Sequence, residues 1–145
     1  MPAISHSIRV PEALENEIKR EIARRGIREW STGVLQLVDE AIRMSRAPGI
    51  MFVNAREGRR AALAFSGLEI WEIIAFWKER NENWEVFRAD FEELTEAQLR
   101  AALNYYALYP REIDERLARE AYWTEERVAQ ELPFTRPPSR AETGQ

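Results

Sequence analysis

The 145-residue sequence contains no cysteine and a single histidine, His6. Without thiols the chain cannot form disulfides or thiolate metal sites, and one imidazole is too few for a zinc or iron centre. No apolar stretch approaches the roughly 18 residues that a membrane-spanning helix needs, and the opening MPAISHSIRV lacks the basic and apolar regions of a signal peptide. We therefore expect a cytoplasmic protein with no metal, no cofactor and no membrane contact.

Motifs for catalysis are also missing. The sequence has no nucleophile elbow, phosphate loop or histidine-centred triad. The adjacent carboxylates Glu92-Glu93 and Glu125-Glu126 do not form a site, because neighbouring residues on a helix point about 100° apart. We expect these pairs to lie on the solvated surface, and we expect a protein that is not an enzyme.

The composition, with 45% hydrophobic and 32% charged residues, is typical of a folded globular chain. A chain of this length buries a small core, so we expect a partner subunit to complete it. The net charge of −4 hides an asymmetry, since residues 1–60 hold 11 basic against 8 acidic residues and residues 61–145 hold 10 against 17. Only the first part, at +3, has the charge to approach phosphates.

The first 47 residues predict a strand and two helices. Residues 5–10 alternate polar and apolar, which indicates a half-exposed strand, and Pro11 suits the first position of a helix that Gly26 ends. Ser31 or Thr32 can cap a second helix that runs to Pro48 and carries an apolar stripe: Val34, Leu35, Val38, Ala41 and Ile42. A lone strand needs a neighbour, and the same strand of a second subunit is the simplest one. We therefore expect a homodimer or a higher even oligomer.

Beyond Pro48 the pattern predicts a hairpin of residues 50–55 and 59–65, with Gly58 in its turn. Helical spacing follows from residue 70 to 77, a polar break at 81–83, a short helix with Trp84 and Phe87, and a helix that Thr95 opens and Pro110 ends. Residues 111–132 predict one further, highly charged helix before Pro133, and the rest predicts a tail. The aromatic residues between 71 and 109 lie among aliphatic ones, which favours a core over a stacking platform for single-stranded nucleic acid.

The outward face of the predicted strand holds Ser5, Ser7 and Arg9. A two-stranded ribbon fits the major groove of DNA, where arginine reaches guanine and serine donates or accepts. The alternative is an edge strand whose polar side chains only face solvent. The first turn of the second helix, with Ser31 and Thr32, offers free N–H groups to a phosphate, and plain capping is the alternative there.

Residues 1–46 resemble the ribbon-helix-helix family of bacterial repressors and antitoxins, in SIRVPEAL and STGVLQLVDEAIRM. The loop GIREW is longer than the tight turn usual there. Residues 48–117 resemble a family of bacterial helix-turn-helix domains linked to VapB-type antitoxins, in PGIMF, GRRAALAFSGLEIWEI and LTEAQLRAALNYYALYPREIDERL. This resemblance implies pairing with a PIN-type ribonuclease toxin and repression of the chain's own operon.

These patterns predict a mainly α fold with short β: a ribbon-helix-helix, then a β-hairpin and a helix-turn-helix-like helical module. The expected domains are 1–47, 48–123 and a C-terminal helix end with tail, 124–145. In the second module, Thr95, Glu96, Gln98 and Arg100 face outward on the candidate reading helix, but the acidic segment FRADFEEL favours packing or dimerisation instead. Arg56, Arg59 and Arg60 around the hairpin turn are candidates for phosphate contact, or simply solvated.

The C-terminal segment combines apolar anchors with arginines, which suits a clamp on a carboxylate-lined nuclease. The residues we assign to toxin binding are Arg127, Leu132, Phe134, Arg136 and Arg140. A disordered tail is the alternative. The function we expect is that of an antitoxin that binds double-stranded operator DNA as a dimer and neutralises a PIN-type toxin. The alternative is a dimeric protein-interaction module that does not bind DNA.

Overall fold

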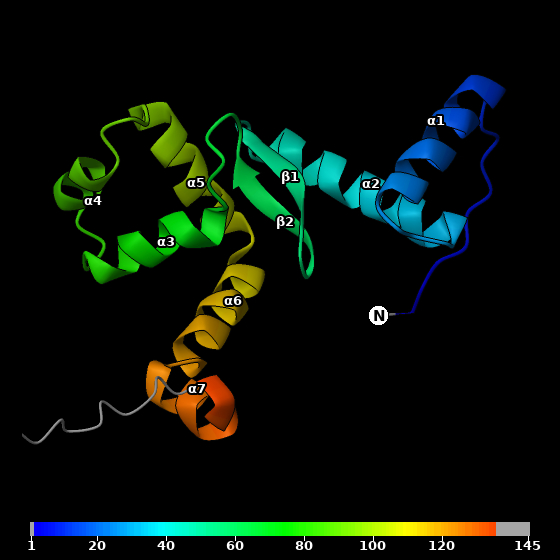
Figure 1. Cartoon of the computed structure of the whole chain (residues 1–145). Helices are drawn as coiled ribbons and strands as arrows, with labels where there is room; N and C mark the ends of the chain where they lie inside the picture. The colour runs from blue at the N-terminus through cyan, green and yellow to red at the C-terminus, as the bar shows by residue number, and fades with distance from the viewer. Residues whose placement is uncertain (1, 136–145) are drawn as a thin grey trace, which may run out of the picture.

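The computed structural model describes residues 2–135 and is mainly helical, with one two-stranded antiparallel hairpin (Figure 1). This confirms the predicted class of a mainly α fold with short β. No helix within residues 2–135 combines the length and apolarity needed to cross a membrane. The elements in chain order are α1 Glu12–Arg24, α2 Trp30–Arg46, β1 Ile50–Ala55, β2 Gly58–Leu63, α3 Ile70–Glu79, α4 Trp84–Asp90, α5 Glu96–Leu108, α6 Pro110–Tyr122, α7 Glu125–Glu131 and the 3-10 turn Pro133–Thr135.

The first predicted helix is α1, which ends before Gly26 as predicted but begins at Glu12, because Pro11 is its N-cap and not its first helical residue. Helix α2 begins earlier than predicted, because Glu29 is its N-cap and Ser31 and Thr32 already lie in its first turn. The prediction that one of these two residues caps the helix is therefore wrong. Extended backbone at Glu29, with ψ of 126°, lets the helix start at Trp30 without a side-chain cap.

Residues 2–11 have no regular secondary structure in the single chain, so the strand predicted at residues 5–10 is not formed there. The physical reason is the one that the sequence suggests, since a strand exists only when a neighbour accepts its backbone hydrogen bonds. Figure 1 shows this segment drawn out along the end of the molecule that α1 and α2 form. Its pairing with a second subunit stays a prediction.

The hairpin of β1 and β2 confirms the predicted pair of strands. The strands are in register from Ile50 opposite Leu63 to Ala55 opposite Gly58. Gly58 has φ of +113°, a conformation that only glycine adopts without strain, and it closes the turn after Arg56 and Glu57. The hairpin therefore presents both arginines of β2, Arg59 and Arg60, immediately beside its turn.

Helices α3, α4 and α5 follow as predicted, with local caps that explain their limits. Asn81 and Glu82 adopt positive φ at the polar break, and the Asn83 side chain accepts a hydrogen bond from the N–H of Val86 to begin α4. Thr95 caps α5 in a reciprocal capping box with Gln98. Pro110 then ends α5 and starts α6 at its first position.

The predicted helix over residues 111–132 is wrong as a single element. It is divided into α6 and α7, because the chain leaves the helix at Trp123 and Thr124 begins a new one. The Thr124 hydroxyl accepts a hydrogen bond from the N–H of Arg127, which satisfies one of the first-turn donors of α7. The sequence contains this signal, since a threonine before two glutamates is a typical helix start.

The core lies where the hairpin packs against α3 and α5, and side chains of α4 and α6 complete it. Its buried residues are Ala47, Ile50, Ala61, Leu63, Ile70, Ile73, Ile74, Phe87, Phe91, Leu99, Ala102, Tyr105 and Ile113. The prediction that most aromatic residues serve the core is confirmed, because Trp71, Trp77, Trp84, Tyr106 and Tyr109 pack against this cluster. Phe76 differs, with 41% of its surface exposed, although its ring meets Phe91 edge to face.

Helix α2 connects this core to the N-terminal part of the chain. Ala47 just after its end is completely buried in the core, and Glu40 on its last turns is 3% exposed. Contacts therefore cross the predicted boundary between residues 47 and 48.

Candidate nucleic-acid interface

The three polar residues assigned to a DNA-facing ribbon, Ser5, Ser7 and Arg9, are all exposed. Arg9 makes no hydrogen bond or ion pair with any residue between 2 and 135. The apolar residues that alternate with them, Ile4 and Ile8, are 80% and 71% exposed. Residues 4–9 thus present free polar and free apolar groups in alternation.

A hollow of about 350 Å³ separates this segment from the first turns of α2. It is lined by Ile4, Ser5, His6, Ile8, Trp30, Ser31, Val34 and Leu35. Two predicted groups of DNA contacts, Ser5 and Ser31, therefore lie on the same hollow. The N–H groups of Ser31 and Thr32 belong to the first turn, which has no intrahelical acceptor for them. The Thr32 hydroxyl, however, donates to the Glu29 carboxylate at 3.3 Å.

The apolar stripe of α2 faces solvent in the single chain. Leu35 is 69% exposed, Val38 is 50% and Ile42 is 52%. The buried positions of this helix are Gly33 and Glu40, on the opposite side. Together with Ile4, Ile8 and Leu14, the stripe leaves six large apolar side chains exposed within residues 4–42.

Glu40 forms a buried ion-pair network, and it explains where Arg59 goes. Its carboxylate lies 2.6 Å from Nη1 of Arg25 and 2.6 Å from Nη2 of Arg59. The Arg25 and Arg59 side chains are only 7% and 14% exposed, and Arg59 also donates to Asn54 and to the carbonyl of Phe52. Arg59, predicted as a phosphate contact, is thus held by internal acceptors, and it joins the hairpin to α1 and α2.

Arg25 of this network and its neighbour Arg24 also change the pKa of a second carboxyl group, that of Glu21. Hydrogen bonds from Arg24 and Arg25 lower the pKa of Glu21 to about 2. Glu21 therefore stays ionised beside Arg25, and it holds the guanidinium that reaches Glu40.

The residues predicted on the α5 reading helix are used within the fold. Thr95 and Gln98 bond to each other's backbone N–H at 3.1 and 2.8 Å. Arg100 pairs with Glu96 at 2.9 Å and covers the Trp84 ring at 4.6 Å. The hollow beside α4 and α5 is lined by Glu85, Glu92 and Glu96 as well as Arg88. This surface favours packing over contact with phosphates.

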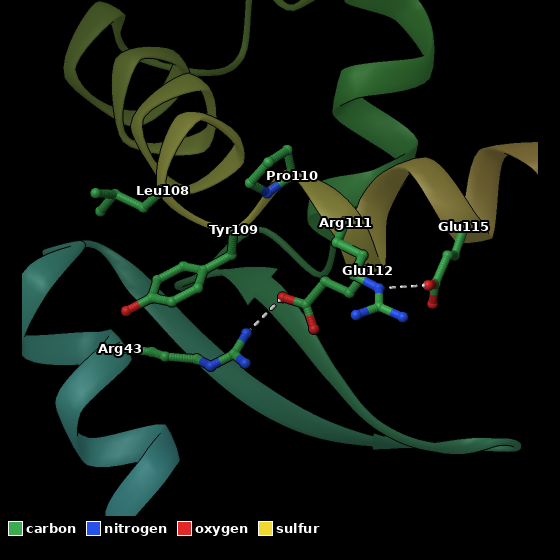
Figure 2. A pocket seen from close by; sticks show the side chains of 7 residues that line it. All are labelled: Arg43, Leu108, Tyr109, Pro110, Arg111, Glu112 and Glu115. Atoms are coloured by element: carbon green, nitrogen blue, oxygen red, sulfur yellow. Dashed lines mark hydrogen bonds and ion pairs between the residues drawn. The ribbon is translucent and has the colours of Figure 1, made fainter. Parts of the chain in front are cut away.

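Figure 2 shows a second hollow, of about 300 Å³, where the end of α2 meets the corner between α5 and α6. Arg43 reaches across it to Glu112 at 2.8 Å, and its guanidinium lies 4.3 Å from the centre of the Tyr109 ring. Arg111 points away from this pair toward Glu115 (Figure 2). The charged groups of the hollow are therefore matched, and the contacts fix α2 to the second module.

Tyr105 lies behind this pair and is completely buried. Its hydroxyl accepts from Arg43 at 3.0 Å and donates to Glu112. Burial, together with the hydrogen bond to Glu112, raises the pKa of Tyr105 well above its ordinary value. The phenol stays neutral and serves as a fixed link between α2 and α6.

Of the predicted toxin-binding residues, Arg127, Leu132 and Phe134 are described and exposed, whereas Arg136 and Arg140 lie outside the described residues. Phe134 is 83% exposed and Leu132 is 39% exposed. The guanidinium of Arg127 lies 4.0 Å from the centre of the Tyr122 ring, and Tyr122 and Trp123 are 44% and 50% exposed. This end of the chain presents several uncovered rings together.

The carboxylate pairs remain on the surface, with Glu92, Glu93, Glu125 and Glu126 all exposed. No group of three or more histidine, cysteine, aspartate or glutamate residues suited to a metal ion occurs within residues 2–135.

Sequence patterns missed Glu40 and the Arg43–Tyr105–Glu112 contact. Glu40 sits in a charged stretch beside Asp39, so nothing local distinguishes it from a solvated residue. The sequence contains one signal for this network. Arg25, Glu40 and Arg59 each lie within a predicted helix or strand, where a charged residue that becomes buried needs a charged partner.

Comparison with known proteins finds no matching family model, no matching curated protein and no matching solved structure.

Proposed function

We propose that this chain is a dimeric DNA-binding regulator of the antitoxin type. Two copies pair through the exposed apolar side chains of residues 4–42, and their N-terminal segments form an antiparallel ribbon that places Ser5, Ser7 and Arg9 in the major groove. The second module and the C-terminal end then bind a PIN-type ribonuclease.

One observation carries the proposal: large apolar side chains are exposed on the N-terminal segment and on α2, next to an unpaired Arg9. A folded chain rarely leaves such a set uncovered unless a partner covers it. A second copy suits this surface, because a two-fold interface uses the same patch twice and gives each segment an antiparallel neighbour. The dimer also doubles the +3 charge of residues 1–60.

The DNA part is tested by fluorescence anisotropy at a fixed salt concentration, with a duplex taken from the region upstream of the gene. We expect Arg9→Ala to weaken binding by about 1–3 kcal/mol, as the loss of one base-edge contact does. The matched control is Arg111→Ala, since Arg111 is 92% exposed on α6 and its removal changes the charge equally. Absence of binding by the parent protein, or equal losses in both variants, contradicts DNA recognition by the ribbon.

The toxin part is tested by co-expression with the protein encoded beside this chain. A co-purifying complex that silences a ribonuclease active in the free partner supports the antitoxin function. A partner without nuclease activity contradicts it.

A dimeric interaction module that does not bind DNA is the second candidate. It is favoured by the second module, where Thr95, Gln98 and Arg100 serve capping and packing and residues 61–145 carry −7. This candidate predicts a dimer with no salt-dependent affinity for any duplex.

A further inference from the structure

Three arginine side chains converge on a single carboxylate oxygen at the turn of the hairpin. Oε2 of Glu57 lies 3.1 Å from Nη2 of Arg60, 3.2 Å from Nη1 of Arg116 and 3.8 Å from Nη1 of Arg119. The cations come from β2 and α6, which are far apart in sequence. We call these three residues the arginine cluster.

The cations of the cluster are better fixed than the anion. The side chains of Arg60 and Arg116 are 19% and 20% exposed, and Arg116 stacks over the Trp71 ring at 4.6 Å. Glu57 is 60% exposed and sits on the hairpin turn. Its carboxylate can therefore leave the cluster by rotation of one exposed side chain, while Arg60 and Arg116 keep their places.

The cluster also contains more buried N–H donors than acceptors. Nε of Arg116 and Nε1 of Trp71 are buried and have no hydrogen-bond partner within the described part of the chain. Both residues line a cavity of about 20 Å³ together with Arg59, Arg60, Ala61, Glu112 and Ile113. Buried donors without acceptors are costly, and a cavity of this size holds a single water molecule that would satisfy them.

We propose that the arginine cluster is a binding site for a phosphate dianion and that Glu57 occupies it when the dianion is absent. Arg116 also pairs with Glu120 at 2.9 Å, so three guanidinium groups less one carboxylate leave a charge of +2 once Glu57 turns away. A dianion matches this charge. The four oxygens of phosphate also suit several guanidinium forks better than the two of a carboxylate.

The ligand is a compact phosphate and not a nucleic acid backbone. Residues 61–145 carry a net charge of −7, which repels a long polyanion, and Arg59, the nearest further cation, is already held by Glu40. Inorganic phosphate and a small phosphomonoester share the required chemistry. The site depends on neither DNA binding nor a toxin.

The test uses the full chain and inorganic phosphate as the probe, with affinity measured by calorimetry at constant ionic strength set with chloride. We expect Glu57→Gln to bind phosphate roughly two- to fivefold more tightly, because a competing exposed ion pair is removed. Arg116→Lys keeps a cation over Trp71, and Arg119→Ala changes an exposed position, so both should fold as judged by circular dichroism. Both should bind phosphate more weakly than the parent, whereas Arg111→Ala should not.

Glycerol phosphate and a short DNA duplex are measured in the same way. Tighter binding of glycerol phosphate than of inorganic phosphate assigns the site to a phosphomonoester, and the reverse assigns it to free phosphate. The proposal is overturned if Glu57→Gln binds no more tightly than the parent, if the cluster variants behave like Arg111→Ala, or if only the duplex binds.

Discussion

Glu40 combines a charged side chain with almost complete burial. Its carboxylate meets Arg25 from the end of α1 and Arg59 from β2. Such a network need not be more stable than an apolar replacement, but removal of Glu40 leaves the buried Arg59 without a charged partner and takes one of two carboxylates from Arg25.

We therefore predict that Glu40→Ala lowers the free energy of unfolding by about 3–5 kcal/mol. Urea denaturation followed by circular dichroism measures this loss. The neighbouring Asp39→Ala is the control, since Asp39 is 61% exposed and its pair with Arg43 is worth less than about 1 kcal/mol. Similar losses of unfolding free energy in both variants would mean that the buried network stabilises the fold no more than an exposed ion pair does.

Phe65 adopts φ of +63° and its ring is fully exposed in the turn after β2. The turn is fixed by hydrogen bonds from the N–H of Ala64 to Gly49 and from the Ser66 hydroxyl to Leu63. A residue with a Cβ is disfavoured in this conformation, while glycine is not.

For this reason Phe65→Gly should raise the free energy of unfolding by about 1 kcal/mol. Thermal and urea unfolding provide the measurement. Asn81→Gly serves as the comparison, because Asn81 has φ of +52° and asparagine tolerates the left-handed region, so its gain should be smaller. A destabilised Phe65→Gly protein would show that the ring contributes contacts that offset the strain.

Among the elements, α1 and α2 pack closely because Gly33 has no side chain. A Cβ at Gly33 would lie 2.4 Å from Cγ1 and 2.6 Å from Cδ1 of Ile22, which is 5% exposed. The usual cost of glycine inside a helix is accepted here for the close approach of the two helices.

We expect Gly33→Ala to destabilise the chain by about 1–3 kcal/mol through overpacking, despite the better helix propensity of alanine. A double-mutant cycle with Ile22→Ala measures the cause, since the penalty should nearly vanish once the isoleucine side chain is gone. If Gly33→Ala destabilises the Ile22→Ala variant as much as it destabilises the parent, overpacking against Ile22 is not the cause.

For the whole molecule, the exposed stripe of α2 is the surface that sets the proposed oligomeric state. Val38 lies at the middle of this stripe and is 50% exposed, so glutamate there is solvated in a monomer and buried without a partner in the proposed dimer.

Val38→Glu is therefore predicted to convert the dimer to a folded monomer, with the mass measured by analytical ultracentrifugation. Val86→Glu is the matched control, because Val86 on α4 is 46% exposed and lies outside the stripe. A parent protein that sediments as a monomer, or a Val38→Glu variant that remains a dimer, rules out this interface.

The sequence by itself determined most of the elements. Periodicity with a local stop or cap predicted α1 between Pro11 and Gly26, α5 after Thr95, and the hairpin turn at Gly58. These signals depend on residues within one or two turns of each other. Local signals gave wrong predictions at two places: helical periodicity over 111–132 hides the cap at Thr124, and Ser31 or Thr32 suits an N-cap by residue type although the N-cap is Glu29.

Only the tertiary structure decided which charges are buried and which apolar residues are not. Glu40 looks like Asp39 in sequence, yet Arg25 and Arg59 approach it from elements 15 and 19 residues away, and a pattern along the chain cannot express that meeting. The arginine cluster likewise exists only because α6 passes the hairpin turn, which brings Arg116 to Glu57. Leu35 and Ile42 show the reverse, since their spacing is that of a buried stripe, but in the single chain they are exposed and the side with Gly33 and Glu40 is buried. A buried charge requires partners from distant segments, so only the three-dimensional fold determines which charged residues are buried.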